Sequence, residues 1–434
     1  MVKNKRFGLA LSGGGYRAAA FHIGALKKLN ELQLLDRLDV LSTISGGSIT
    51  GAKYCLHQGS FKEFEEQMIF ALSTGNVIKY TLRSRRFLLA AIPAFLLLLV
   101  SIILPFTAWA FFSFIPLFVL IFLILKFQFQ LLPISAIIEK AYDDLFFKGA
   151  ALSQMRTVPE LAIGATNLQT MRPFTFSKRK MEDSAYARYK QPVLFDNRDF
   201  PIARAVTASS CVPFAFSPVF IDKLYFKDQS MFDTVEPALV DGGVYDNQGI
   251  HKLTQKNSSY ACDIIIVSDA GNRLPFREAY HNTFTLLLRT VNVFMVRIKH
   301  FQMIQNIYEN HYGREVAYQS LGWDLNDCIP GFYNNLKDRN ISDQVLIAHK
   351  LPQLWINSPE VYENDIKAYL EHKCRFNEIL ARSLPGERLK IIRNIGTNLT
   401  CLKKEVVEDM IVHAENLTEL QIRLYCPTLF EDEL

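Results

Sequence analysis

The feature that most constrains the fold is a stretch of 39 residues, Phe87–Leu125, that contains no charged side chain. A single straight helix of this length would measure about 58 Å, which is nearly twice the ~30 Å hydrocarbon core of a bilayer. Two helices of roughly 18 to 20 residues fit that thickness, with a turn near Pro105–Thr107. We therefore expect a membrane-embedded helical hairpin. The alternatives are a buried pair of core helices and a hairpin that lies in the membrane interface.

The charges that flank this stretch indicate an orientation. Lys79, Arg83, Arg85 and Arg86 precede the stretch, and Lys126 follows it. Basic residues next to membrane spans gather on the cytoplasmic side, so both ends of the hairpin are expected there. The seven cysteines are scattered and form no CxxC pair, which favours reduced thiols over disulfides or a metal site. No signal peptide is evident at the start. We expect a multi-pass protein of a bacterial inner membrane with its globular part in the cytoplasm.

The remaining composition narrows the partners. The net charge is only +5, and the chain has no long Lys/Arg block and no zinc-ligand spacing, so nucleic acid is not an expected partner. With 434 residues the chain can bury a sizeable core and hold two or three domains. The sequence does not indicate an oligomeric state.

A glycine loop lies close to the N-terminus. The apolar run Phe7–Leu11 predicts a strand, and the spacing of apolar residues over Tyr16–Leu29 predicts a helix. Between them lie Gly13, Gly14 and Gly15, which allow positive φ angles and bring N–H groups close to an anion. That anion is a phosphate or the oxyanion of acyl transfer. The nucleotide-binding patterns GxxxxGK[ST] and GxGxxG are absent. Arg17 either supports the oxyanion or holds the loop through a carboxylate.

A second turn follows in Leu38–Gly51. Its first residues alternate as in a short strand, the chain turns at Ser45-Gly46-Gly47, and a helix can start at Ser48. A serine between a strand and a helix is the arrangement of a nucleophile elbow, although Thr43 stands where the usual GxSxG pattern has its first glycine. A plain turn serine is the alternative.

A carboxylate with similar placement follows much later. The apolar run before Asp241 predicts a strand that ends in Asp241-Gly242-Gly243. In an α/β sheet, ligands gather at the carboxyl edge of the strands, so this position suits catalysis, although Asp-Gly is also a common turn. Ile264–Val267 predicts a buried central strand, and the chain after about residue 275 reads as mostly helical. A loop over Asn394–Leu399 could return to the sheet.

Taken in order, these motifs resemble the patatin-like phospholipase family. The resemblance rests on the glycine loop with Arg17, on Ser45-Gly46-Gly47-Ser48 and on Asp241-Gly242-Gly243. Segments Ala165–Leu168 and Ala208–Pro213 are also similar to segments of the family. It implies a three-layer α/β/α fold with a mostly parallel sheet, and no metal or cofactor.

The resemblance also implies roles for individual residues. Ser45 would be the nucleophile and Asp241 its base. The oxyanion donors would be Gly13, Gly14 and Gly15, and the supporting residues Arg17, Gly46, Gly47 and Gly242. Such a dyad agrees with the residues themselves, because a serine needs an adjacent base and a stabilised oxyanion. A Ser-His-Asp triad is the rival mechanism, but His22, the histidine nearest the glycine loop, has a helical position typical of packing.

These expectations combine into one hypothesis. Residues 5–60 and 150–272 would form the catalytic domain, 61–149 an insertion that contains the hairpin 87–125, and 273–434 a mostly helical region packed on or extending the catalytic domain. The expected function is a membrane-anchored serine lipid acyl hydrolase of the phospholipase A or lysophospholipase type, with membrane lipids as substrates. The alternatives are a non-catalytic membrane scaffold or lipid-binding module, and a lipid acyltransferase.

Overall fold

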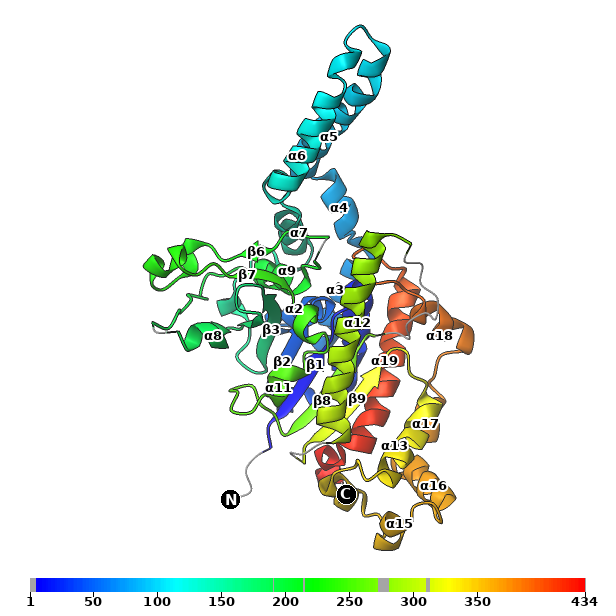
Figure 1. Ribbon diagram of the computed structural model, residues 1–434. Coiled ribbons are helices and arrows are strands. Elements are labelled where there is room, and N and C mark those ends of the chain that lie inside the picture. The colour runs from blue at the N-terminus through cyan, green and yellow to red at the C-terminus, as the bar shows by residue number, and fades with distance from the viewer. Residues whose placement is uncertain (1–4, 190, 214, 272–280, 310–312, 434) are drawn as a thin grey trace.

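The computed structural model describes residues 5–433 apart from 190, 214, 272–280 and 310–312. Its described strands form one nine-stranded sheet, in which the main path runs β5-β4-β3-β2-β1-β8-β9 (Figure 1). Strands β3, β2, β1, β8 and β9 are parallel, whereas β4 and β5 continue the sheet antiparallel at one edge. The strands are β1 (Phe7–Leu11), β2 (Val40–Ile44), β3 (Glu160–Asn167), β4 (Arg172–Phe176), β5 (Met181–Asp183), β6 (Val219–Phe220), β7 (Ala238–Asp241), β8 (Ile264–Asp269) and β9 (Glu315–Ser320).

Helices surround this sheet and form the insertion and most of the C-terminal region. They are α1 (Gly15–Glu31), α2 (Gly46–Leu56), α3 (Phe61–Thr74), α4 (Val77–Arg83), α5 (Arg85–Ile103), α6 (Phe114–Leu131), α7 (Ile134–Tyr142), α8 (Ser184–Ala187), α9 (Ile202–Ser210), α10 (Gly243–Asp246), α11 (Ile250–Thr254), α12 (Thr283–Met303), α13 (Cys328–Lys337), α14 (Asp343–His349), α15 (Gln353–Asn357), α16 (Glu363–Lys373), α17 (Phe376–Leu380), α18 (Gly386–Arg393) and α19 (Lys404–Tyr425).

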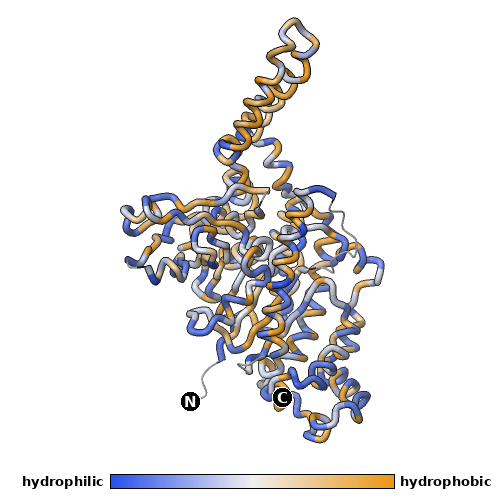
Figure 2. Tube along the Cα trace, in the orientation of Figure 1, coloured by the Kyte–Doolittle hydropathy of each residue, from blue (hydrophilic) through white to orange (hydrophobic). Residues whose placement is uncertain are grey.

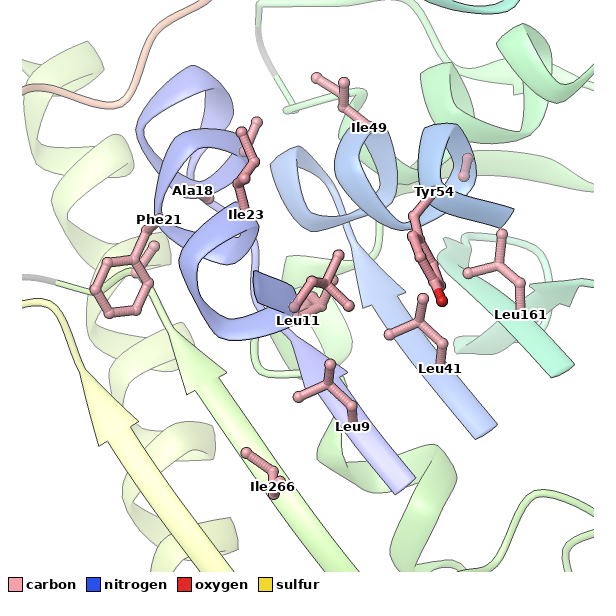
Figure 3. Packing of buried hydrophobic residues seen from close by; sticks show 14 of the residues in the cluster. Leu9, Leu11, Ala18, Phe21, Ile23, Leu41, Ile49, Tyr54, Leu161 and Ile266 are labelled. Atoms are coloured by element: carbon pink, nitrogen blue, oxygen red, sulfur yellow. The ribbon is translucent and has the colours of Figure 1, made fainter. Parts of the chain in front are cut away.

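The central strands are buried on both faces, as expected for the middle of three layers. Leu9 and Leu11 of β1 face the larger core under α1, α2 and α19, while Ala10 between them faces a smaller core under α11. Figure 3 shows Leu9, Leu11 and Leu41 of the sheet pointing toward Ile23 of α1 and Tyr54 of α2. This alternation follows from the two-residue period of a strand. The expected three-layer α/β/α fold with a mostly parallel sheet is confirmed.

The C-terminal region contributes more to the sheet than its sequence indicated. Besides many helices it contains β9, which pairs in parallel with β8 from Ile264↔Glu315 to Asp269↔Ser320. Helix α19 packs along α1 on the larger core. The chain between α18 and α19 returns to the glycine loop, where the Asn398 carbonyl accepts the Tyr16 N–H at 2.9 Å.

The apolar stretch forms a hairpin that projects from the body (Figures 1 and 2). Helix α5 ends at Ile103, short 3₁₀ turns follow at Leu104–Phe106 and Ala110–Phe112, and α6 returns alongside α5. The expected turn near Pro105–Thr107 is therefore confirmed. Two segments, Arg85–Phe106 and Ala110–Phe147, are long and apolar enough to cross a membrane, and none of their apolar window is buried inside the molecule. The hairpin is therefore not a buried core pair.

Candidate active site

Strand β7, which ends at Asp241, lies beside the serine turn because β3 extends past the end of β2. We call this extension of β3 the overhang. Strand β2 pairs with β3 only as far as Ile44↔Gly164, but β3 continues to Asn167. Strand β7 runs antiparallel to β3 and pairs with that overhang, with Asp241 opposite Ala165. Asp241 therefore lies level with Ser45, the residue that follows Ile44. Asp241 therefore lies at the edge of the sheet where the parallel strands end, although its own strand β7 is antiparallel to them.

Ser45 sits in the geometry of a sharp elbow. Its φ of 49° and ψ of −117° are unusual for a residue with a side chain, and α2 begins at the next residue. Its backbone N–H donates to the Ser209 Oγ at 2.9 Å, and Ser209 donates in turn to the Gly164 carbonyl at 2.6 Å. Such conformations cost about 1–3 kcal/mol and persist only where the surroundings hold them. Ser209 is one of the residues that hold this turn.

The Asp241 carboxylate is shielded from water and lies beside the serine turn. Only 7% of the residue is exposed, its Oδ1 accepts the Gly243 N–H at 2.7 Å, and the Ser45 hydroxyl is near enough to lower its pKa. Burial raises the pKa of Asp241 from 3.8 to about 7, although the Gly243 N–H and the Ser45 hydroxyl both act to lower this pKa. A carboxylate with this pKa can accept a proton near neutral pH.

The glycine loop turns its backbone toward the same point. The Gly13 N–H donates to the Asn247 carbonyl at 2.9 Å, so that N–H group is engaged within the protein. Gly14 and Gly15 have φ angles of 141° and 59°, and among the described residues their N–H groups have no hydrogen-bond partner. A side chain on Gly13 would lie 3.2 Å from the Ser45 Cβ, which shows how closely the two turns approach.

Arg17 links the glycine loop to the C-terminal region of the chain. Its Nη1 donates to the Ile395 carbonyl at 2.8 Å, and a side chain on Gly14 would lie 3.5 Å from its Nη2. Burial lowers the Arg17 pKa, and the nearby Asp269 charge partly offsets this. Of the two roles considered for Arg17, the structure favours holding the loop, through a carbonyl and not a carboxylate.

The supporting glycines allow the two turns to pack backbone to backbone. A side chain on Gly46 would run into the backbone of Gly15, and one on Gly242 would lie 2.5 Å from the Gly164 carbonyl. The Gly47 N–H donates to the Ser12 carbonyl at 3.1 Å and ties α2 to the end of β1. The structure thus brings together all the residues that the sequence analysis selected.

Thr43 fits the elbow because α2 leaves room for it. Its Oγ1 accepts the Ser48 hydroxyl at 3.1 Å, and a side chain on Gly51 would lie 2.6 Å from the Thr43 methyl group. Thr43 and Gly51 therefore fill one space together. The departure from the usual elbow glycine is accommodated by this second glycine one turn into the helix.

We expect Gly51→Ala to lower the free energy of unfolding by about 1–3 kcal/mol, because the new methyl group overpacks the core against Thr43. The measurement is urea denaturation of the variant beside Gly331→Ala, whose added methyl group would meet no atom within 4 Å. Adding Thr43→Ser, which removes the opposing methyl group but keeps the hydroxyl, should restore most of the loss. Equal stability of the two alanine variants would contradict this packing.

His22 takes no part in a triad with Ser45. It is fully buried, its Nε2 lies 2.9 Å from the Ser12 carbonyl and its Nδ1 2.9 Å from the Ser268 Oγ. Burial lowers its pKa to about 4, so the ring is neutral at physiological pH. It packs and bridges β1 to β8, as its helical position indicated.

Three residues of the site were not identified from the sequence. Ser209 holds the Ser45 N–H, Asn247 holds the Gly13 N–H, and Asn398 holds the Tyr16 N–H. Ser209 lies in one of the segments that resemble the family, and its helix α9 packs against α2. Asn247 and Asn398 act through main-chain carbonyls, and no side-chain pattern indicates such a role.

Comparison with known proteins gives a family and several distant structures. The model of the family described as Patatin-like phospholipase matches residues 9–254, and no curated protein is similar enough to count as a match. Human GIVD cytosolic phospholipase A2 is 14% identical with a TM-score of 0.40, and the alignment covers 68% of this chain and 48% of that one. This chain therefore spans about half the length of the human protein.

Two bacterial structures are also similar. VipD from Legionella pneumophila is 12% identical with a TM-score of 0.30, covering 98% of this chain and 91% of that one. The complex of SpcU with ExoU from Pseudomonas aeruginosa gives 13% identity and a TM-score of 0.23, covering 96% and 70%. These three TM-scores are too low to indicate a substrate for this chain. The family model, in contrast, spans more than half of the chain and includes the glycine loop, Ser45 and Asp241. The chain belongs to the patatin-like phospholipase family.

Proposed function

We propose that this protein is a membrane-anchored serine hydrolase that cleaves acyl esters of lipids through a Ser45–Asp241 dyad. The observation that carries the proposal is a buried Asp241 carboxylate, level with the Ser45 turn, whose pKa burial raises to about 7 and the Ser45 hydroxyl lowers in part. A serine hydroxyl becomes an effective nucleophile when an adjacent base can take its proton. The membership of the chain in a phospholipase family supports lipid esters as the substrate class.

The reaction would proceed in two halves. Asp241 takes the Ser45 proton as Oγ attacks the ester carbonyl, and the oxyanion that forms is stabilised by backbone N–H groups. We assign that role to Gly14 and Gly15, since the Gly13 N–H already serves the Asn247 carbonyl. The ester C–O bond then breaks, and the leaving alkoxide receives the proton from Asp241. In the second half, Asp241 deprotonates a water that attacks the acyl-serine, which releases the fatty acid and restores Ser45.

The hairpin would supply the membrane anchor. Each candidate span is long enough for a ~30 Å hydrocarbon core, and its apolar side chains are exposed, including Phe95 at 62% and Phe118 at 69%. Helix α7, which follows the hairpin, packs on α9, the helix that contains Ser209. An anchor joined to the site in this way would keep the dyad near the lipid surface, in the cytoplasm if the basic flanks of the hairpin set its orientation.

We also propose that residues 273–434 belong to the same folding unit as residues 5–60 and 150–272. Strand β9 extends the sheet, α19 covers the larger core and Asn398 contacts the glycine loop. Residues 61–149 would then be an insertion between the elbow and the carboxylate.

The test is a product analysis on mixed phospholipid vesicles that contain the reconstituted protein, with a Ser45→Ala preparation as the blank. We expect free fatty acid and lysophospholipid in equal amounts, in proportion to the enzyme. An acyl ester of an added lipid alcohol in place of fatty acid would identify a transferase. Release no greater than the blank, on every phospholipid class, would favour a lipid-binding scaffold.

A further inference from the structure

The base of the hairpin combines an apolar groove with an adjacent group of cations. The groove has a volume of about 550 Å³ and lies between α5, α6 and the turn at residues 215–217. Apart from Gln128 and Ser217, its lining side chains are apolar. The volume is within the ~300–1,000 Å³ typical of small-molecule sites.

The cations next to the groove carry positive charge that no ion pair among the described residues neutralises. Lys79, Arg83, Arg85 and Arg86, here called the basic cluster, form no salt bridge within the residues that the structure describes. Arg85 lines cavities of about 610 and 560 Å³, and the smaller one has no acidic residue in its wall. In the larger cavity, Glu139 pairs with Arg204 at 3.1 Å and Asp143 with Lys140 at 3.7 Å. The positive charge of Arg85 and Arg86 is therefore not neutralised from within.

The start of α5 adds main-chain donors at the same place. Ser84 caps the helix by accepting the Phe87 N–H at 3.2 Å, and the N–H groups of Arg85 and Arg86 have no partner among the described residues. Free N–H groups and the positive end of a helix both favour an anion. The next residue, Phe87, already lines the apolar groove.

We infer that this is a binding site for one anionic phospholipid. Its phosphate would lie against Arg85 and Arg86, and an acyl chain would lie in the groove along α5. An amphiphile with one charged end and one apolar end matches the order of the two features along the helix. A soluble phosphate ester would leave the groove empty, and a neutral lipid would leave the basic cluster unpaired.

The groove is also connected to the dyad. At its inner end, the Ser217 carbonyl accepts hydrogen bonds from the Ser135 hydroxyl and, at 2.8 Å, from the Cys211 thiol. The Cys211 carbonyl accepts the Asp241 N–H at 2.8 Å. A lipid in the groove would therefore lie against residues 215–217, the turn that Cys211 links to the backbone of Asp241. This part of the inference rests on the proposed function, whereas the binding itself does not.

The test uses the full-length protein with Ser45→Ala in detergent micelles, so that bound lipid is not cleaved. Native mass spectrometry would measure retention of dioleoyl phosphatidylglycerol and of dioleoyl phosphatidylcholine, with inorganic phosphate as a competitor. We expect phosphatidylglycerol to bind at least 10-fold more tightly than phosphatidylcholine, and millimolar phosphate to displace little of it. Equal binding of the two lipids would overturn the proposal, and full displacement by phosphate would show a phosphate site instead.

Two variants with matched controls locate the site. Arg85→Gln/Arg86→Gln and, separately, Ala94→Trp, which fills the groove, should each lower phosphatidylglycerol retention at least 10-fold. Lys62→Gln/Lys256→Gln removes two exposed cations elsewhere, and Leu98→Trp enlarges a side chain on α5 outside the groove lining, so both should bind as the parent does. Retention that ignores Ala94→Trp, or that falls equally in the controls, would contradict the site.

A second readout separates this proposal from the proposed function. With Ser45 present, hydrolysis of a short-chain soluble ester reports the dyad alone. If that hydrolysis is absent while lipid retention behaves as expected, the dyad fails and the lipid site stands. If hydrolysis is normal and the variants retain lipid fully, the lipid site fails and the dyad stands.

Discussion

Ser45→Ala and Asp241→Asn are each expected to lower the turnover of lipid esters by roughly 10³- to 10⁶-fold, the range found when a nucleophile or its base is removed from a hydrolase. Ser45→Ala removes the oxygen that attacks in the proposed mechanism. Asp241→Asn keeps the shape of the side chain and an acceptor for the Gly243 N–H at Oδ1, but an amide cannot take the Ser45 proton. The variants should lose kcat together, and the double variant should be no worse than the more damaged single one.

The same Asp241→Asn change should stabilise the fold. The folded pKa of Asp241 is about 7, above the unfolded value near 3.8, so between these values the folded protein binds more protons than the unfolded chain. The free energy of unfolding therefore falls as pH rises from about 4 to 7, by at most about 4 kcal/mol at ~1.4 kcal/mol per unit. Asparagine carries no charge and avoids this cost.

The pH dependence of activity should run in the opposite direction. In the proposed dyad Ser45 needs the ionised carboxylate, so kcat/KM of the wild type is expected to fall about 10-fold per unit below a pKa near 7. Ionisation of Asp241 thus raises the activity and lowers the free energy of unfolding. Burial of Asp241 accounts for both effects.

Thermal unfolding and initial rates, both followed from pH 4.5 to 8.5, check these expectations. The difference in Tm between Asp241→Asn and the wild type should be small at the acid end and largest above pH 7. Ser45→Gly, which relieves the positive φ of Ser45, should show the opposite pH trend and stabilise most at the acid end, because above pH 7 it also removes the hydroxyl that favours the ionised Asp241. A Tm difference for Asp241→Asn that does not vary with pH, or a variant that keeps its activity, would refute the role of Asp241.

Much of the fold could be predicted because local signals agreed with it. Phe7–Leu11 is apolar throughout and forms β1 with those bounds, and Ile264–Val267 forms most of β8. The glycines after β1 and around Ser45 are typical of tight turns, so they indicated where the site lies in the sequence. The hairpin was evident because a run of 39 residues without a charged side chain is far more typical of membrane spans than of soluble cores.

Other parts depend on pairing that sequence patterns do not carry. Strand β9 reads EVAYQS, and its polar residues are buried because distant partners satisfy them: Lys5 pairs with Glu315 at 2.7 Å, and Gln319 donates to Thr418 at 2.6 Å. Without those partners the segment has no strand pattern. The direction of β7 was also not predictable, since it depends on the length by which β3 extends past β2.

The site shows the same division. Ser45 and Asp241 were selected for the chemistry of their side chains, and the glycines for having none. Both properties can be read from the residue type. Asn247 and Asn398 contribute backbone carbonyls, which every residue has. Ser209 contributes a hydroxyl, but its partner is 164 residues away, so only the packing of α9 on α2 reveals it.

Replacing residues 87–131 with a short Gly/Ser linker is expected to move the protein from the membrane fraction to the soluble fraction. Leu, Ile, Phe and Val each favour the centre of a spanning helix by about 0.3–0.6 kcal/mol, and these residues dominate both α5 and α6. A linker can join Arg86 to Leu132 because α5 and α6 run side by side. The core cluster of the catalytic part contains no residue of either helix, so the rest of the fold should form without them.

Activity should then divide according to substrate. On phospholipid vesicles the shortened protein should lose at least about 100-fold, because it must find a surface to which the anchored protein is already tethered, and such tethering typically contributes 10²–10⁴-fold. On a soluble short-chain ester it should stay within about threefold of the full-length protein, since Ser45, Asp241, Gly14 and Gly15 are untouched. A shortened protein that stays in the membrane fraction, or that still cleaves vesicle lipids at the full rate, would show that the hairpin is not the anchor. Loss on both substrates, with a normal Tm, would instead place the hairpin in the assembly of the active site, because α7 and α9 join its base to Ser209.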